Sequence, residues 1–136
     1  MIKRLSILCL SLAACTDLGD GGFVTAGGTR VNPVNADVFE VIARPRNENN
    51  QFWCGAGEYA HRALGASPGA NVYVVGGAGA AVTMESPNGA QFSLKPPSQV
   101  SGATERDTRW GPRLGQSMFV ADARGRCGRD EFDFPF

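Results

Sequence analysis

The sequence has no excess of charge of either sign, no long apolar run and little histidine. Its 136 residues contain 13 Lys and Arg against 13 Asp and Glu, a formal net charge of zero, and one histidine. This balance argues against the broad basic surface of a nucleic-acid-binding protein. No apolar stretch reaches the roughly 20 residues that a membrane-spanning helix requires, so the sequence predicts no transmembrane helix. The composition suits one small globular domain with flexible segments.

The N-terminus has the pattern of an export signal. Residues 3 and 4 are basic, and residues 5–14 form an apolar run that is too short to span a membrane. The run ends in Leu12-Ala13-Ala14-Cys15. This motif resembles, position by position, the lipobox of bacterial lipoproteins, in which the cysteine thiol receives a diacylglyceryl group. An ordinary secretory signal with a chance cysteine is the alternative.

The resemblance to lipoproteins implies where the mature protein resides. Residues 1–14 would be removed as a signal peptide, and Cys15 would become an N-terminus that carries three acyl chains of the palmitate kind. Several chains bind a membrane far more tightly than a single myristoyl chain does, so the anchor is effectively permanent. Thr16 resembles the class sorted to the outer membrane more than the retained class. We therefore expect a lipid-anchored protein of the cell envelope that faces the periplasm, at the outer membrane.

Two of the four cysteines then remain available for a disulfide. Cys9 would leave with the signal peptide and Cys15 would carry lipid, so Cys54 and Cys127 remain. In an oxidising periplasm an even pair is most simply a disulfide. Closing about 73 residues of chain would stabilise the fold by roughly 4 kcal/mol. The bridge is expected to tie the start of a helix to a turn near the C-terminus.

The mature chain is predicted to begin with a tether and to continue as one domain. Residues 15–36 carry several glycines among Asp, Thr and Asn with no apolar period, which is typical of a flexible tether. Residues 37–136 form the predicted domain. Residues 38–43, rich in β-branched and aromatic side chains, predict a strand. Residues 52–64 predict the only convincing helix, with an apolar stripe that includes Ala63 and Leu64 and a C-terminal stop at Gly65.

The second half of the chain predicts a meander of short strands. Residues 71–75, 81–85 and 91–94 are expected to be strands, with the glycines of residues 76–79 in a hairpin connection. Residues 98–116 predict a long loop, and residues 117–123 a last core strand. Phe132 and Phe134 in the C-terminal tail are expected to dock on the domain. The predicted fold is α+β, a small antiparallel sheet of about four to five short strands packed by one helix.

Cys54 carries the alternative, enzymatic interpretation. A thiol at the start of a helix has a lowered pKa and can act as a nucleophile, and a helix-start cysteine followed by sheet resembles papain-like and cell-wall cysteine peptidases. Those enzymes need a base brought in from the sheet. The only histidine, His61, lies about 10.5 Å further along the same helix. A cysteine-dependent hydrolase that uses Cys54, supported by Glu58 and His61, is kept as the alternative function.

Two further motifs are incomplete. Cys54, Glu58 and His61 share a helical stripe, but zinc prefers four ligands and a di-metal site needs a second such motif. The glycine-rich residues 76–80 resemble a nucleotide-binding loop, but the next glycine and the following helix are missing. We therefore predict no catalytic residue, no metal and no cofactor.

Arg109, Trp110 and Arg113 form the best candidate binding surface. They lie in the long loop, and a tryptophan flanked by arginines can stack on a sugar ring or bind an acidic group. The alternative is that Trp110 folds back over the sheet.

The sequence thus predicts a lipid-anchored protein without catalytic machinery. Its disulfide-bridged domain is expected to act as a binding or structural module for a protein or peptidoglycan partner, with the membrane contacted through lipid and nucleic acid not bound. A solute-binding module with a pocket beside Trp110 is a third interpretation. Residues 52–60 also resemble segments of small uncharacterised lipoproteins, a resemblance that implies no activity.

Overall fold

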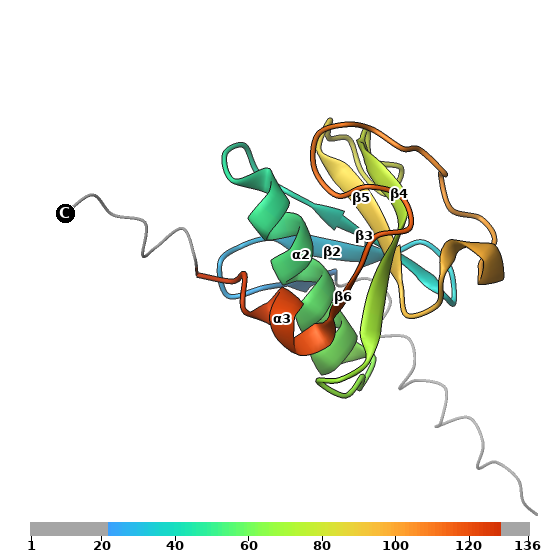
Figure 1. Ribbon diagram of the computed structural model, residues 1–136. Helices are drawn as coiled ribbons and strands as arrows, with labels where there is room; N and C mark the ends of the chain where they lie inside the picture. Colours follow the sequence, from blue (N-terminus) through green and yellow to red (C-terminus); the bar gives the residue numbers. More distant parts are fainter. Residues whose placement is uncertain (1–21, 129–136) are drawn as a thin grey trace, which may run out of the picture.

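A single antiparallel sheet with a helix across one face forms the frame of the molecule. The computed structural model describes residues 22–128. Six strands lie in the order β1-β2-β3-β5-β4-β6, and the helix α2 crosses the sheet (Figure 1). The strands are β1 Phe23–Val24, β2 Arg30–Pro33, β3 Val38–Ile42, β4 Asn71–Gly79, β5 Gly89–Ser93 and β6 Ser117–Phe119. This confirms the predicted α+β class, with slightly more strands than expected.

The strands β1 and β2 lie inside the segment 15–36 that the sequence predicts to be a tether. They form a hairpin whose turn is closed by the hydrogen bond from the Gly28 N–H to the Thr25 carbonyl, 2.9 Å long. Val31 on β2 pairs with Val41 on β3 and is fully buried. The folded domain therefore begins before residue 37, and that boundary is corrected. A hairpin with one buried valine has no apolar period, which is why the sequence pattern does not show it. Residues 15–21 lie outside the described part of the chain.

The predicted helix is present but begins earlier than expected. α2 spans Glu48–Glu58 and continues as the π-helix η1, Tyr59–Ala63. It ends before Gly65, whose φ of 73° fits its predicted role as the C-terminal stop. Leu64, predicted to lie on the apolar stripe, is 45% exposed. The Leu64 N–H bonds to the Tyr59 carbonyl five residues earlier, and such a widened turn rotates the last residues off the buried face. Within residues 22–128, no helix is long and apolar enough to cross a membrane.

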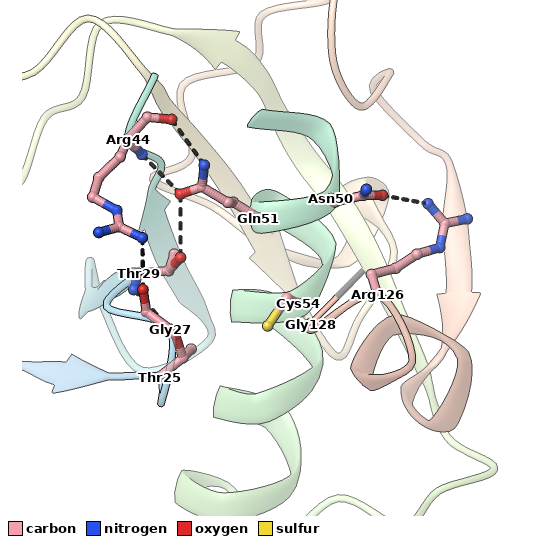
Figure 2. Close-up of a pocket in the computed structure, with 9 residues that line it drawn as sticks. All are labelled: Thr25, Gly27, Thr29, Arg44, Asn50, Gln51, Cys54, Arg126 and Gly128. Atoms are coloured by element: carbon pink, nitrogen blue, oxygen red, sulfur yellow. Dashed lines mark hydrogen bonds between the residues drawn. The ribbon is translucent and has the colours of Figure 1, made fainter. Parts of the chain in front are cut away.

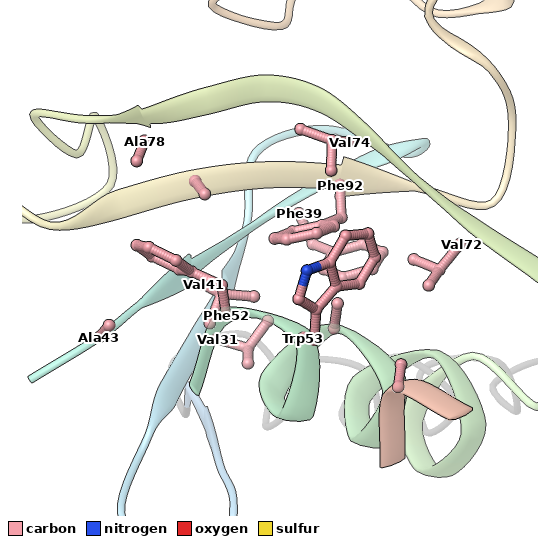
Figure 3. Packing of buried hydrophobic residues seen from close by; sticks show 13 residues of the cluster. Val31, Phe39, Val41, Ala43, Phe52, Trp53, Val72, Val74, Ala78 and Phe92 are labelled. Atoms are coloured by element: carbon pink, nitrogen blue, oxygen red, sulfur yellow. The ribbon is translucent and has the colours of Figure 1, made fainter. Parts of the chain in front are cut away.

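The hydrophobic core lies between α2 and the sheet (Figure 3). Trp53 of α2 is 1% exposed, and its ring meets that of Phe92 on β5 edge to face, with 5.3 Å between the centroids. Phe39 on β3 packs beside Phe92 at 6.2 Å. Valines of β2, β3 and β4 surround these rings. Each large side chain buried in this way contributes roughly 1.5–3 kcal/mol.

Two loops rather than helices cover the opposite face of the sheet. Glu40 alternates with the core residues of β3 and is fully buried. Its carboxylate accepts hydrogen bonds from the backbone N–H groups of Val82 and Thr83 at 2.8–3.1 Å, and from the Gln91 side chain at 3.1 Å. The Gln91 side-chain oxygen in turn accepts the Thr104 N–H at 2.7 Å. Because a buried carboxylate needs such donors, this network holds the loops 80–88 and 100–108 against the sheet.

The glycine run 76–79 lies within strand β4 instead of forming a hairpin. The Gly77 N–H donates to the Arg106 carbonyl at 2.6 Å, and a methyl group at Gly77 would lie 2.6 Å from the same oxygen. The pairing of β4 with β5 shifts register twice between Val74 and Gly79. The predictions of a hairpin at 76–79 and a strand at 81–85 are therefore wrong. Glycines stand in β4 because a loop crosses directly over them, and residues 80–88 form the connection to β5.

The chain after the long loop forms a strand and then a helix. β6 pairs with the beginning of β4, and α3, Val120–Arg124, follows at once. The predicted strand 117–123 is thus correct for its first three residues only. The Val120 and Ala121 N–H groups bond to the carbonyls of Ala70 and Pro68, which precede β4. With no further β4 residue to pair with, the chain turns into a helix against α2.

The disulfide between Cys54 and Cys127 is present. It joins α2 to the turn after α3, with 4.8 Å between the Cα atoms and 73 residues of sequence separation. It links a helix to a turn near the C-terminus, as the sequence predicts, but the expected position of Cys54 at the start of the helix is wrong, because α2 begins at Glu48 and Cys54 lies near its middle.

Candidate functional site

The predicted binding residues lie in a loop that is closed at its base by an ion pair. The Arg113 guanidinium donates two hydrogen bonds to the Asp107 carboxylate, at 2.9 and 3.1 Å, and the Leu114 N–H donates a third at 3.2 Å. These hydrogen bonds, led by that of Arg113, hold the pKa of Asp107 below its usual value. Two parallel bonds between planar groups fix both position and orientation. Residues 107–113 thus form a closed loop, named here the recognition loop.

The loop is also fixed to the sheet on its N-terminal side. The Arg106 side chain donates to the carbonyls of Gly77 and Ala80, at 3.1 and 3.0 Å. The Arg106 carbonyl accepts the Gly77 N–H. The recognition loop therefore starts from backbone that is bonded to β4 and to the residue after it, rather than from a free segment.

Trp110 lies at the tip of the recognition loop and is partly exposed. Its ring centroid is 6.2 Å from that of Phe52, which is buried on α2, while 44% of Trp110 remains open to solvent. Gly111 follows with a φ of 80°, and a methyl group there would lie 3.2 Å from Ala78. Only a glycine adopts this φ without strain and lets the backbone approach so closely. One side of the ring therefore packs on the edge of the core, as the folded-back alternative expects in part, and the other side faces outward; the binding role of Trp110 stays a prediction.

The two arginines of the predicted surface have different roles. Arg113 is committed to Asp107, so it shapes the loop rather than offering its charge. Arg109 is exposed, and within residues 22–128 its side chain has no hydrogen-bonding partner. The outward chemistry of the loop is therefore one aromatic ring beside one cation. Such a pair can stack on a ring or sugar and bind an acidic group beside it.

The helix residues of the alternative, enzymatic interpretation each have an internal partner. Cys54 is oxidised in the disulfide, and Glu58 accepts hydrogen bonds from Arg124 at 2.7 Å and Arg62 at 3.2 Å. His61 Nδ1 lies 3.1 Å from the Ala66 carbonyl. Each of these three side chains thus has its own partner within the protein, and their arrangement does not depend on a metal or substrate bound between them. In the part of the chain that the structure describes, no group of three His, Cys, Asp or Glu residues could hold a metal.

Other sequence predictions fall on residues outside 22–128. The lipobox cysteine Cys15 and the tail residues Phe132 and Phe134 belong to them. The functions predicted for these residues remain predictions.

Sequence reasoning missed Asp107 as a component of the loop. The available signal was an acid and an arginine six residues apart, with Gly111-Pro112 between them, a spacing that suits a closed turn. Pro112, which is part of this loop, is buried. An acid and an arginine at such spacing are common in exposed segments, so this signal alone is weak.

Comparison of the chain with protein families, curated proteins and solved structures finds no match.

Proposed function

We propose that the chain is a lipid-anchored protein of the cell envelope whose domain binds a protein or cell-wall partner through the recognition loop. The observation that carries this proposal is the closure of the loop by Asp107 and Arg113, which presents Trp110 and Arg109 outward on backbone bonded to the sheet. A partner then meets a preformed surface and loses little free energy in ordering it. Tryptophan and arginine are also the residues that most often dominate binding energy at interfaces.

The disulfide supports a location outside the cytoplasm and a role without thiol chemistry. Disulfides persist in oxidising compartments such as the periplasm, in agreement with the export signal and the lipobox at Cys15. A bridge between Cys54 and Cys127 also consumes the thiol that a cysteine hydrolase would need. The binding role is therefore favoured over the hydrolase.

The proposal is tested by photocrosslinking in intact cells, with the crosslinking amino acid in place of Glu105, which is exposed beside the recognition loop but outside it. We expect a crosslinked protein or peptidoglycan fragment with the unaltered loop, and at least a tenfold lower yield when Trp110→Ala is added. Leu64→Ala is the matched control, because Leu64 is an apolar side chain of nearly equal exposure, 45% against 44%, and lies outside the loop. Membrane fractions from a Cys15→Ser strain supply the second arm, in which the protein should be released.

Each arm can fail separately. Equal crosslinking yields for Trp110→Ala and Leu64→Ala would refute the recognition loop. Full membrane retention of Cys15→Ser would refute the lipid anchor and leave the loop unaffected. Thermal unfolding of both alanine variants, followed by circular dichroism, checks that lower yields do not reflect unfolding.

A further inference from the structure

A polar cavity lies beside the disulfide, on residues that the recognition loop does not include. It encloses about 180 Å³ between the β1–β2 turn, the first turns of α2 and the turn after α3. Figure 2 shows Cys54 between the two arginines that line it, Arg44 and Arg126. A water molecule occupies roughly 30 Å³ of liquid, so the cavity has room for several waters or for one small organic ion.

Gln51 holds the walls of the cavity in place. Its side-chain N–H groups donate to the carbonyls of Arg44 and Arg46, at 2.9 and 2.7 Å. Its oxygen accepts the Arg44 N–H at 2.9 Å and the Thr29 hydroxyl at 3.2 Å. Every donor and acceptor of this amide is used, and the contacts join α2, the loop before it and the β1–β2 turn. The cavity is therefore built by a fixed internal network.

The acceptors that face the cavity are largely occupied by the protein itself. The Gly27 carbonyl accepts an Arg44 Nη at 2.6 Å, and the Asn50 side-chain oxygen accepts an Arg126 Nη at 3.4 Å. The Thr25 hydroxyl oxygen accepts the Thr29 N–H at 3.1 Å. Any ligand that enters the cavity thus meets few free lone pairs on its walls.

The donors, in contrast, are in excess. A guanidinium has five N–H groups, and Arg44 and Arg126 each use one in the contacts above. Within residues 22–128 the Asn50 side-chain NH₂ donates to no acceptor. The same holds for the hydroxyl hydrogen of Thr25, although that residue is only 5% exposed. Arg44 is exposed and Asn50 and Arg126 are half-buried, so water reaches their spare N–H groups, whereas the buried Thr25 hydroxyl is costly to leave without an acceptor.

The cavity is also positively charged. Among the residues that the structure describes, two arginines line it and no carboxylate does. Glu48, on the neighbouring first turn of α2, directs its carboxylate to the backbone N–H of Arg46 at 3.1 Å. Excess donors and a positive charge together favour a ligand that is negatively charged and rich in oxygen lone pairs.

We propose that this cavity is a binding site for a small oxyanion, that is, a carboxylate or phosphate group of a small solute. Arg44 supplies the principal charge on one side of Cys54 and Arg126 on the other, while Thr25 and Asn50 donate to the oxygens. The volume admits a group of the size of acetate or phosphate. The site is separate from the recognition loop, so its occupancy does not depend on the proposed partner.

The test uses the full chain extracted from membranes in detergent and followed by ¹H–¹⁵N NMR at constant ionic strength. The probes are inorganic phosphate, acetate and acetamide, the last being the uncharged counterpart of acetate. We expect saturable shifts of the Asn50 side-chain NH₂ and the Arg44 Nε–H with phosphate, acetate or both. Acetamide should produce none. A response to one anion alone identifies whether the site takes a phosphate or a carboxylate.

Variants then locate the binding. Arg44→Gln and Arg126→Gln should each raise the Kd at least tenfold, whereas Arg46→Gln, a nearby arginine that does not line the cavity, should leave it within twofold. Trp110→Ala should bind the probes unchanged, which separates this site from the recognition loop. Unfolding midpoints within a few degrees of that of the unaltered chain show that each variant is folded.

Several outcomes would overturn the proposal. They are the absence of saturable shifts with both anions, equal shifts with acetamide, and equal weakening by Arg46→Gln, which would indicate only a diffuse positive field. The tail beyond Gly128 carries Asp130, Glu131 and Asp133. If the probes bind only after these three are changed to Asn, Gln and Asn, the chain's own carboxylates fill the cavity and no external solute is needed.

Discussion

Glu58 of α2 forms an ion pair with Arg124 of α3 and so links the two helices. Its carboxylate lies 2.7 Å from Arg124 Nε on α3 and 3.2 Å from Arg62 Nη1 on η1. Burial alone would raise the pKa of Glu58, but the hydrogen bonds and charges of the two arginines outweigh that effect and lower it. The ionised carboxylate is therefore favoured more in the folded state than in the unfolded chain.

This lowered pKa predicts how stability depends on acidity. The contribution of Glu58 is fully present above its ordinary pKa of 4.5 and is lost as the pH falls through the lowered value. Glu58→Gln should reduce the free energy of unfolding at pH 7 by about 1 kcal/mol, and the difference from the unaltered chain should shrink below pH 4.5. Urea unfolding at pH 7 and pH 3 measures both. Glu85→Gln, at an exposed position, should change neither, and a Glu58→Gln difference that is equal at both pH values would contradict the assignment.

Single residues were predictable where their chemistry leaves few choices. The pairing of Cys54 with Cys127 follows once the other two cysteines are assigned to the N-terminal signal. The partner of Arg113 was not predictable, because an exposed arginine can meet many acids and only the closed loop selects Asp107. The burial of Glu40 was likewise invisible, since its donors come from residues 82, 83 and 91, which are distant in sequence.

At the scale of elements, two glycines let α2 approach its neighbours closely. A methyl group at Gly55 would lie 2.6 Å from Val41 on β3, and one at Gly57 would lie 2.7 Å from the Arg124 N on α3. Glycine costs about 1 kcal/mol relative to alanine inside a helix. Glycine is nevertheless needed at both positions, because an added Cβ would lie closer to its neighbour than Cβ atoms in folded proteins come.

The contact at Gly57 reverses the usual effect of replacing a helical glycine. Gly57→Ala should destabilise the fold by about 1–3 kcal/mol despite the better helix propensity of alanine, because the added methyl group pushes α3 away. Urea unfolding measures the change. Gly69→Ala is the control, since a methyl group there meets nothing within 4 Å and should leave stability within about 0.5 kcal/mol. A more stable Gly57→Ala variant would show that α3 does not pack this closely.

Elements were predictable where a local pattern decides them. The strand 38–42 is rich in β-branched and aromatic residues, the helix around residues 52–58 carries an apolar stripe at helical spacing, and both are present. β1, β2 and the glycine-rich half of β4 carry no such signal, because they are held by neighbouring strands and by the loop that crosses them. Tertiary contacts therefore override local propensity in these segments.

At the scale of the whole molecule, the disulfide closes most of the domain into one loop. A bridge over 73 residues is expected to stabilise the fold by roughly 4 kcal/mol, because it reduces the freedom of the unfolded chain. Reduction should lower the free energy of unfolding by about that amount. The double variant Cys54→Ser, Cys127→Ser should show the same loss with or without a reductant. Urea unfolding of both forms is the measurement, and an unfolding curve of the native chain that reductant leaves unchanged would contradict the bridge.

The overall architecture and the candidate site were predictable to different extents. The α+β class follows from one clear helix and several short strands. Trp110 could be identified as a candidate because it lies in a long polar loop that contains no other tryptophan. The cavity beside Cys54 was not predictable, because its walls come from three segments that approach only in the folded chain. Sequence patterns identify exposed segments, whereas cavities depend on packing between elements.

The placement of the two tryptophans has a spectroscopic consequence. The sequence contains only Trp53 and Trp110, and the first is sealed in the core while the second is half open to water. A sealed indole emits at short wavelength and is shielded from dissolved quenchers, whereas an open one emits at longer wavelength and is quenched. Ultraviolet emission can thus distinguish an event at the loop from a change in the interior, without any attached label.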